Sequence, residues 1–251
     1  MKRIVERSDT GKYKIRFVAE ECWEKKLVEG VKYIIDDIDS ICERDPAARN
    51  RAEVLLLYSG VHALILYRFA HVFHVKGWKF PARALSQFAR FLTGVEIHPG
   101  AKIGKGLFID HGAGVVIGET AIIGDYCTIY QGVTLGGTGK QTGKRHPTLG
   151  NNVMVGSGAK VLGNFTVGDN VKIASGAVVL TEIPANCTAV GVPAKVVIKD
   201  GEKVVDRERR RPHSDLDQVH IPDPVENEIA AVVKRLEAVE ALLAEKEAET
   251  R

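Results

Sequence analysis

The sequence predicts an α+β fold: an N-terminal α-helical domain, then a left-handed parallel β-helix of hexapeptide repeats, then a C-terminal amphipathic or coiled-coil helix. Aliphatic residues recur at every sixth position in the middle of the chain, and helical spacings of apolar residues flank that repeat. Only 6 % of the residues are aromatic while 25 of 251 are glycine, which suits a core of small and β-branched side chains joined by tight turns.

Residues 1–93 are expected to form the helical domain. Apolar residues between Val28 and Ile41 recur at spacings of three and four, and the whole of residues 15–93 is predicted to be helical. A second helix is expected from Pro46 through Val75, ended by Gly77, and a third over residues 81–92.

The most apolar window of the chain, residues 54–73, contains His62, Arg68 and His71. These side chains are costly inside a bilayer, so the window predicts a buried helix rather than a membrane span.

The repeat predicts that residues 94–198 form the β-helix, interrupted by a loop over residues 139–148. Each hexapeptide would supply one short strand and one turn, with its lead side chain in a narrow core. Three hexapeptides per coil would give about four coils, and the left-handed winding is taken from the repeat type against the usual right-handed rule. Eleven of the thirteen lead positions are Ile, Leu or Val. The lead positions are Ile97, Ile103, Ile109, Val115, Ala121, Cys127, Val133, Leu149, Val155, Val161, Val167, Ile173 and Val179.

The end of the chain is expected to hold a charged linker, residues 199–224, and a helix, residues 225–251. The basic run Arg207–Arg211 suits a solvated linker, with a phosphate-binding patch as the alternative. Apolar residues of the helix follow a heptad spacing that suits self-association, or else packing on its own subunit. They are Ile229, Val232, Leu236, Val239 and Leu243.

The charge, the cysteines and the N-terminal segment argue against a nucleic-acid binder, a disulfide-bonded protein and a membrane protein. The net charge of +3 is too small for a dedicated nucleic-acid binder. The four cysteines are widely spaced and include no CxxC pair, which predicts reduced thiols in a cytoplasmic protein. The polar N-terminal segment 1–16 has no apolar stretch of the kind found in signal peptides, so no membrane association is expected.

Three polar features interrupt the repeat: the segment from Glu96 to His98, the pair Asp110–His111, and the loop. The loop concentrates Lys140, Lys144, Arg145 and His146, which suit a carboxylate or phosphate. A lone histidine is more often structural, but His98, His111 and His146 lie near the start and the loop of one rigid scaffold. A functional site is therefore expected there.

These residues resemble the serine O-acetyltransferase family. The resemblance rests on IHPGAKIGKGLFIDHGAGVVIGET, VTLGGTGK, RHP and GVPAK, together with Arg44–Asp45–Pro46 and residues 58–64 upstream. It extends over residues 41–198. It implies transfer of an acetyl group from acetyl-CoA to the hydroxyl of L-serine, giving O-acetylserine for cysteine synthesis. It also implies no permanently bound cofactor and no metal.

The resemblance also implies roles for individual residues. His111 falls on the family's catalytic base and Glu96 on its acidic partner, where the family usually has the shorter Asp. The substrate-binding residues fall on Asp45, Asp110, Arg145 and His146. The acetyl-CoA region falls on Gly136, Gly137, Thr138, Ala159, Ala177 and Lys195.

Family resemblance implies a homotrimer with the acetyl-CoA site between adjacent β-helices. A hexamer is possible, but the helical region before Asp45 is short compared with members that pair trimers. The charged end Glu247–Arg251 differs from the family's flexible tail ending in Ile, so a stable complex with O-acetylserine sulfhydrylase is not expected. Three alternatives stay open: an acetyltransferase for another hydroxyl acceptor, a zinc carbonic anhydrase using His98, His111 and His146, and a non-catalytic scaffold.

Overall fold

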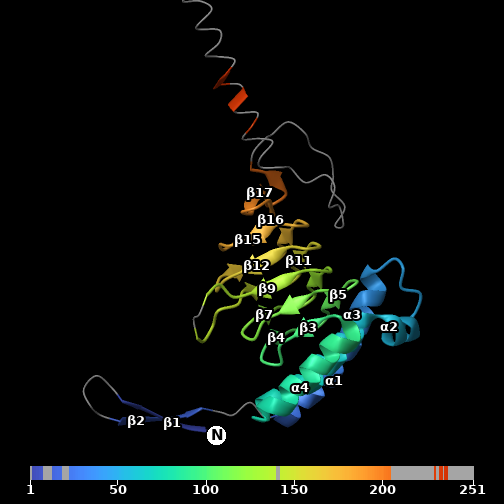
Figure 1. Ribbon diagram of the computed structural model, residues 1–251, viewed down its shortest axis with the longest axis vertical. Coiled ribbons are helices and arrows are strands. Elements are labelled where there is room, and N and C mark those ends of the chain that lie inside the picture. Colours follow the sequence, from blue (N-terminus) through green and yellow to red (C-terminus); the bar gives the residue numbers. More distant parts are fainter. Residues whose placement is uncertain are drawn as a thin grey trace, which may run out of the picture.

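Helices α1 (Trp23–Arg44), α2 (Arg51–Leu57), α3 (Ser59–Val75) and α4 (Lys79–Thr93) lie at one end of a stack of short strands (Figure 1). The structure is a computed structural model. It describes residues 2–7, 13–18, 23–139 and 142–204, with side chains from residue 28 onward, and the helical positions 229, 232, 233, 235 and 236.

The expectation of helix from residue 15 onward is wrong at its start. Strands β1 (Lys2–Arg7) and β2 (Tyr13–Val18) pair antiparallel, and helix begins only at Trp23. The reason is visible in the sequence YKIRFV, where large apolar and basic residues alternate with a period of two rather than 3.6.

The helix expected over residues 46–75 is two helices. The first turn forms at Arg51 rather than at Pro46 because the Asn50 side chain accepts the Glu53 N–H at 2.9 Å and caps the helix. Tyr58 then leaves the helical region (φ −85°, ψ 113°), and α2 and α3 are bent by 73° there. This break fixes where the Tyr58 side chain emerges.

Helix α3 is a core helix, as expected of the apolar window. Its Val61, Ala63, Leu64 and Ala70 are at most 1 % exposed. The start of that window, however, lies in α2, where Leu55, Leu56 and Leu57 are 40 %, 68 % and 72 % exposed. Within the described residues, no single helix has both the length and the apolar composition needed to cross a membrane. The bent pair of α2 and α3 meets those criteria of length and composition only when the two helices are counted together.

The strands β3 to β15 stack in three parallel sheets, each a face of the β-helix. One sheet contains, in order, β15 (Val178–Val179), β12 (Lys160–Leu162), β9 (Thr134–Gly136), β6 (Val116–Ile117) and β3 (Glu96–Ile97). The second contains β13 (Thr166–Val167), β10 (Thr148–Leu149), β7 (Ile122–Ile123) and β4 (Lys102–Ile103). The third contains β18 (Glu202–Lys203), β17 (Lys195–Lys199), β16 (Cys187–Val190), β14 (Lys172–Ile173), β11 (Met154–Val155), β8 (Thr128–Ile129) and β5 (Phe108–Ile109).

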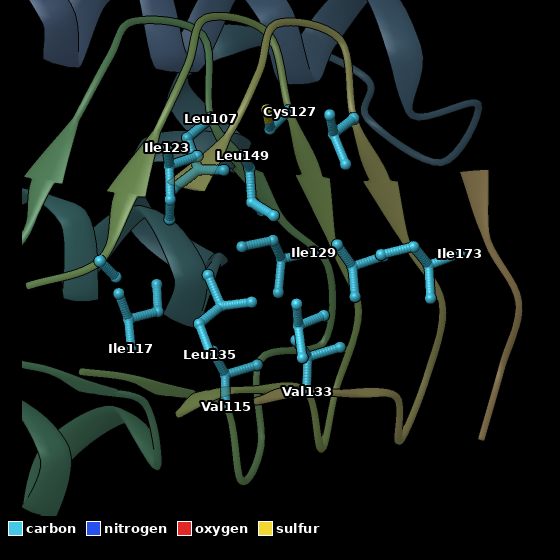
Figure 2. Close-up of a cluster of buried hydrophobic side chains, with 14 of the residues drawn as sticks. Leu107, Val115, Ile117, Ile123, Cys127, Ile129, Val133, Leu135, Leu149 and Ile173 are labelled. Carbon is cyan, nitrogen blue, oxygen red and sulfur yellow. The ribbon is translucent and has the colours of Figure 1, made fainter. Parts of the chain in front are cut away.

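Between residues 115 and 133, the strand residue of each hexapeptide lies two positions after the expected lead residue. Two extra residues follow Ile109, so Ile97 pairs with Ile117, whereas later in the chain Leu149 pairs with Val167 after the regular eighteen residues. The strand residues that enter the core are Ile117, Ile123, Ile129 and Leu135. The expected lead residues Val115, Ala121, Cys127 and Val133 are also buried, two positions before each of these (Figure 2).

The helices cover the open edge of the first coil with hydrogen-bond donors. Backbone N–H groups of that coil donate to the second coil, as Glu96 does to Val115 at 2.9 Å, so its carbonyl groups face the helices. The Tyr67 hydroxyl donates to the Ala101 carbonyl at 2.7 Å, and buried Arg68 donates to the carbonyls of Ile103 and Gly104, each at 2.6 Å. These bonds satisfy buried backbone groups and fix α3 on the β-helix.

Close contact between α3 and the coil depends on Gly60. A Cβ atom at Gly60 would lie 2.2 Å from the Ile109 carbonyl oxygen, so α3 can approach this strand only with glycine there. The approach brings the start of α3 next to the residues that follow Ile109, which include Asp110 and His111.

At the other end, β16, β17 and β18 pair antiparallel. Pairing therefore continues to Lys203, inside the region expected to be a linker. The basic run Arg207–Arg211 and the heptad residues Val239 and Leu243 lie outside the described residues. Ile229, Val232 and Leu236 are helical and more than half exposed.

Candidate active site

His111 lies in the turn that the two extra residues create between β5 and β6. Its backbone is left-handed (φ 58°), and its side chain is 74 % exposed. The Asp110 N–H donates to the Ile129 carbonyl at 2.9 Å and the Ser59 hydroxyl donates to the His111 carbonyl at 3.2 Å. The turn thus presents the imidazole to solvent from a backbone held on both sides, by the second coil and by the first residue of α3.

The Asp110 carboxylate lies beside this imidazole, and its charge interacts in turn with Asp45. The His111 Nε2 is 3.9 Å from the Asp110 Oδ1. Burial raises the pKa of Asp110, His111 lowers it, and the neighbouring charge of Asp45 raises it further. Asp45, which follows α1, therefore lies close enough to interact with Asp110. The predicted residues Asp110 and His111 lie side by side, and Asp45 is linked to them through its charge interaction with Asp110, an arrangement that favours a cation.

The Asp45 carboxylate is bound through both of its oxygens. Its Oδ1 accepts the Ala47 N–H at 2.8 Å, and its Oδ2 accepts the Tyr58 hydroxyl at 2.7 Å. Sequence reasoning placed Tyr58 within the family motif but gave it no role. The signal was weak because the hydrogen bond depends on the break between α2 and α3.

Arg145 and His146 lie in the loop between β9 and β10, against Glu119 and Thr120. The Thr120 hydroxyl oxygen accepts the N–H of Arg145 at 3.0 Å and that of His146 at 3.1 Å. The Arg145 guanidinium donates to the Glu119 carboxylate at 2.5 Å, and this bond lowers the pKa of Glu119. Glu119 and Thr120 were not among the predicted site residues, because only the folded loop shows these contacts.

The His146 ring is held in one neutral tautomer. Its Nδ1 accepts the Thr120 N–H at 3.1 Å, so the ring proton of the neutral form is on Nε2. Burial lowers the pKa of His146, and the charges of Arg145 and Lys144 lower it further. Neutral His146 therefore carries its ring proton on Nε2, in a residue that is 8 % exposed and follows Arg145 in the chain, and an N–H donor and a guanidinium both suit a carboxylate.

The two groups lie at different corners of the β-helix. The turn with His111 joins the seven-stranded sheet to the five-stranded sheet, whereas Glu119 and Thr120 lie between the five-stranded and four-stranded sheets. Within the described residues, no hydrogen bond or ion pair joins Asp45, Asp110 or His111 to Arg145 or His146. One chain therefore places the two groups of residues at separate corners.

The alternative zinc site of His98, His111 and His146 has no geometric support in this chain. Among the residues that the structure describes, no group of three His, Cys, Asp or Glu side chains is close enough to hold a metal ion. His98 instead accepts the Gly100 N–H through its Nδ1 at 3.0 Å, and burial lowers its pKa to about 4.

The expected pairing of Glu96 with His111 is not seen in the structure. Its carboxylate forms an ion pair with Arg90 of α4 at 3.2 Å, and the described residues show no ion pair between Glu96 and His111. Arg90 lies in the last turn of α4, and its side chain is 57 % exposed. No pattern in the sequence indicated that this turn would approach the start of β3.

Two of the residues expected to bind acetyl-CoA are buried in the core. Ala159 is fully buried and Ala177 is 1 % exposed, because each lies two positions before a strand residue that enters the core. Their methyl groups cannot contact a ligand on the surface. Gly137, Thr138 and Lys195 are exposed, and Gly136 is partly buried at the end of β9.

Comparisons with known proteins all indicate the same family. A model of the bacterial transferase hexapeptide family (six repeats) matches residues 146–181. The chain is 54 % identical over 209 residues to a serine acetyltransferase of Synechococcus elongatus, covering 83 % of this chain and 82 % of that protein. It is 66 % identical over 163 residues to one of Helicobacter pylori, covering 65 % of this chain and 95 % of that protein. The crystal structure of a Neisseria gonorrhoeae serine acetyltransferase in complex with serine is 42 % identical, with a TM-score of 0.67, and the match covers 70 % and 72 % of the two chains.

Proposed function

The chain belongs to the serine acetyltransferase family, and we propose that this serine O-acetyltransferase works by direct attack, with His111 as the general base. The observation that carries the proposal is the exposed His111 imidazole with Asp110 beside it at one turn of the β-helix, together with Asp45, whose charge acts on Asp110. An imidazole next to this carboxylate pair matches an acceptor that carries both an ammonium group and a hydroxyl group.

The reaction needs a base because a serine hydroxyl is a poor nucleophile at neutral pH. Neutral His111 accepts the hydroxyl proton while the oxygen attacks the thioester carbonyl of acetyl-CoA. The tetrahedral intermediate collapses, the C–S bond breaks, and the CoA thiolate takes the proton from the imidazolium. No acyl-enzyme forms, and the protein needs no permanently bound cofactor.

The two groups of residues fit the two ends of serine. Asp45 and Asp110 suit the ammonium group, while Arg145 and the Nε2–H of His146 suit the carboxylate. Serine must displace Glu119 from Arg145 or share that guanidinium with it. The bond between Glu119 and Arg145 holds the guanidinium in one place before substrate arrives.

Because the two groups lie at different corners, we propose that a complete site forms between two chains of a homotrimer. A closed ring with a three-fold axis places one corner of each chain beside a different corner of the next. Coils wound left-handed, as is typical of this repeat, would give a prism with three such interfaces. The helix proposed for residues 225–251 would add to the assembly, and pairing of two trimers into a hexamer remains a second form.

Acetyl-CoA is proposed to bind on the outer surface beside the loop. Gly137 and Thr138 are exposed at the end of β9, next to the partly buried Gly136, and their backbone groups can meet a ligand there, while Lys195 offers a cation. A Cβ atom at Gly137 would lie 3.2 Å from the Arg145 carbonyl oxygen, so the loop packs tightly against this glycine. The thioester would then lie within reach of the serine hydroxyl at the interface.

A panel of acceptors tests the function. Release of CoA thiol from acetyl-CoA should be fastest with L-serine and much slower with L-threonine, homoserine and simple sugars. D-serine is the matched control, since it carries the same groups in the opposite configuration. Faster turnover of a sugar or of homoserine would replace this function with an acetyltransferase for another hydroxyl acceptor.

Glu96 is proposed to orient the His111 imidazole once substrates bind. Its ion pair with exposed Arg90 is worth only about 0–1 kcal/mol, so the carboxylate can turn toward the imidazole at little cost. We expect Glu96→Gln to lower kcat about tenfold and Glu96→Asp to have a mild effect, because Asp keeps the charge. Thiol-release kinetics at saturating substrates measure both.

Arg90→Ala is the control for this prediction. It frees Glu96 without changing it, so kcat should stay within about twofold of the unchanged protein. If Glu96→Gln and Glu96→Asp both left kcat unchanged, Glu96 would have no part in the reaction.

A further inference from the structure

We infer that Tyr58 is a positioning residue, which holds the Asp45 carboxylate toward Asp110 so that the two together select an acceptor with an ammonium group. The inference rests on the proposed function, because it concerns how the site recognises serine. It assigns a role to a residue whose hydroxyl donates to Asp45 and not to His111.

The fold fixes the Tyr58 backbone between two helices. Its N–H donates to the Val54 carbonyl at 3.3 Å at the end of α2, and its own carbonyl accepts the Val61 N–H at 3.1 Å at the start of α3. The side chain packs against the small core of Ile38, Ile41, Val54, Val61 and Phe108. Because both backbone and ring are held, the hydroxyl has a defined direction.

That direction matters because Asp45 and Asp110 carry charges of the same sign. The neighbouring charge of Asp45 raises the pKa of Asp110, so the two carboxylates repel each other when no cation lies between them. Asp45 is in the segment between α1 and α2, outside any helix, and its carboxylate is bound by the Ala47 N–H and the Tyr58 hydroxyl. Without the hydroxyl, the carboxylate could rotate away from Asp110.

Tyr58 keeps its proton in this arrangement. Burial raises the pKa of Tyr58 to about 12, and the hydrogen bond to Asp45 contributes to the rise. The phenol is therefore a permanent donor over the working pH range and exchanges no proton with substrate. Its effect should appear in binding of the amino acid rather than in the chemical step.

Tyr58→Phe tests the inference, since it removes only the hydroxyl oxygen and keeps the packed ring. We expect the serine KM to rise about tenfold, the scale of a lost hydrogen bond to a charged group, with kcat and the acetyl-CoA KM unchanged. Calorimetric titration with L-serine alone should show the same loss of affinity. Tyr126→Phe, at the corner between β7 and β8, is the matched control and should change neither constant, because the 44 % exposed Tyr126 packs its ring against Lys105 and not against Asp45.

A double-mutant cycle with Asp45→Asn distinguishes two roles of Tyr58. One is to position the Asp45 carboxylate, and the other is only to stabilise the break between α2 and α3. Asp45→Asn alone should raise the serine KM, and adding Tyr58→Phe should raise it no further, because Tyr58 acts through the carboxylate. Equal effects of Tyr58→Phe in both backgrounds, or a fall in kcat together with the thermal midpoint, would overturn the inference alone. An unchanged serine KM in Asp45→Asn would overturn both the inference and the proposed ammonium site.

Discussion

Replacing His111 with alanine should lower kcat by at least about a hundredfold, the lower end of what a general base contributes. The imidazole is 74 % exposed and contributes little to the core, so the fold should remain intact. Thiol release measured at saturating serine and acetyl-CoA isolates the chemical step. Circular dichroism and the elution volume of the assembly check that the loss is chemical.

His111→Asn sharpens this experiment. The His111 backbone is left-handed (φ 58°), a conformation that asparagine adopts more readily than alanine. Asparagine therefore keeps the turn and a polar side chain but cannot accept the hydroxyl proton as a base. We expect the same loss of kcat in both variants, and a recovery in His111→Asn would mean that the alanine variant failed through its backbone.

His62→Ala is the matched histidine control, since His62 bonds the Leu55 carbonyl and lies outside the proposed site. It should leave kcat unchanged. Turnover of His111→Ala close to that of the unchanged protein would remove His111 as the base. Asp110, whose carboxyl lies 3.9 Å from the imidazole, would then be the next residue to test.

The β-helix could be predicted from the sequence, but the residue of each hexapeptide that lies on the strand could not. The expected lead positions Val115 and Val133 and the true strand residues Ile117 and Leu135 are all buried and aliphatic. Each coil buries two residues per hexapeptide, two positions apart, so a period of six does not decide which one lies on the strand. Only pairing with the first coil, Ile97 with Ile117, reveals the two extra residues.

The two extra residues lengthen the turn that contains Asp110 and His111, and the period of six did not predict this longer turn. Asp110 and His111 interrupt an otherwise apolar pattern, which marked them as candidates. Their projection from the β-helix follows from the longer turn. The helix start at Arg51 could have been predicted, because Asn50 followed three residues later by Glu53 is a typical capping pattern.

The partners of the site residues could not be predicted, because they come from different coils and helices. Glu96 meets Arg90 only because α4 ends beside β3, and Arg145 meets Glu119 only because the loop folds back on the preceding coil. Residue types gave the chemistry of each side chain. The separation of His111 and Arg145 depends on which corner each occupies, and that follows from the coil register.

Mixing two impaired variants should restore activity if the site is shared between chains. In trimers assembled at random from equal amounts of His111→Ala and Arg145→Ala chains, about a quarter of the interfaces pair an intact His111 with an intact Arg145. Assayed at low serine, where each variant alone is nearly inactive, the mixture should recover about a quarter of the full activity. Co-expression with two different affinity tags allows the mixed trimers to be isolated.

The control is a pair of variants from the same corner. His111→Ala and Asp45→Asn alter two residues that one chain brings together, so every interface in their mixed trimer lacks one of them and activity should not return. A site built within one chain predicts no recovery in either mixture, because each chain then carries its own defect. Recovery with Arg145→Ala but not with Asp45→Asn would place the carboxylate-binding corner on the neighbouring chain. Recovery with both would mean that Asp45 and His111 serve different sites.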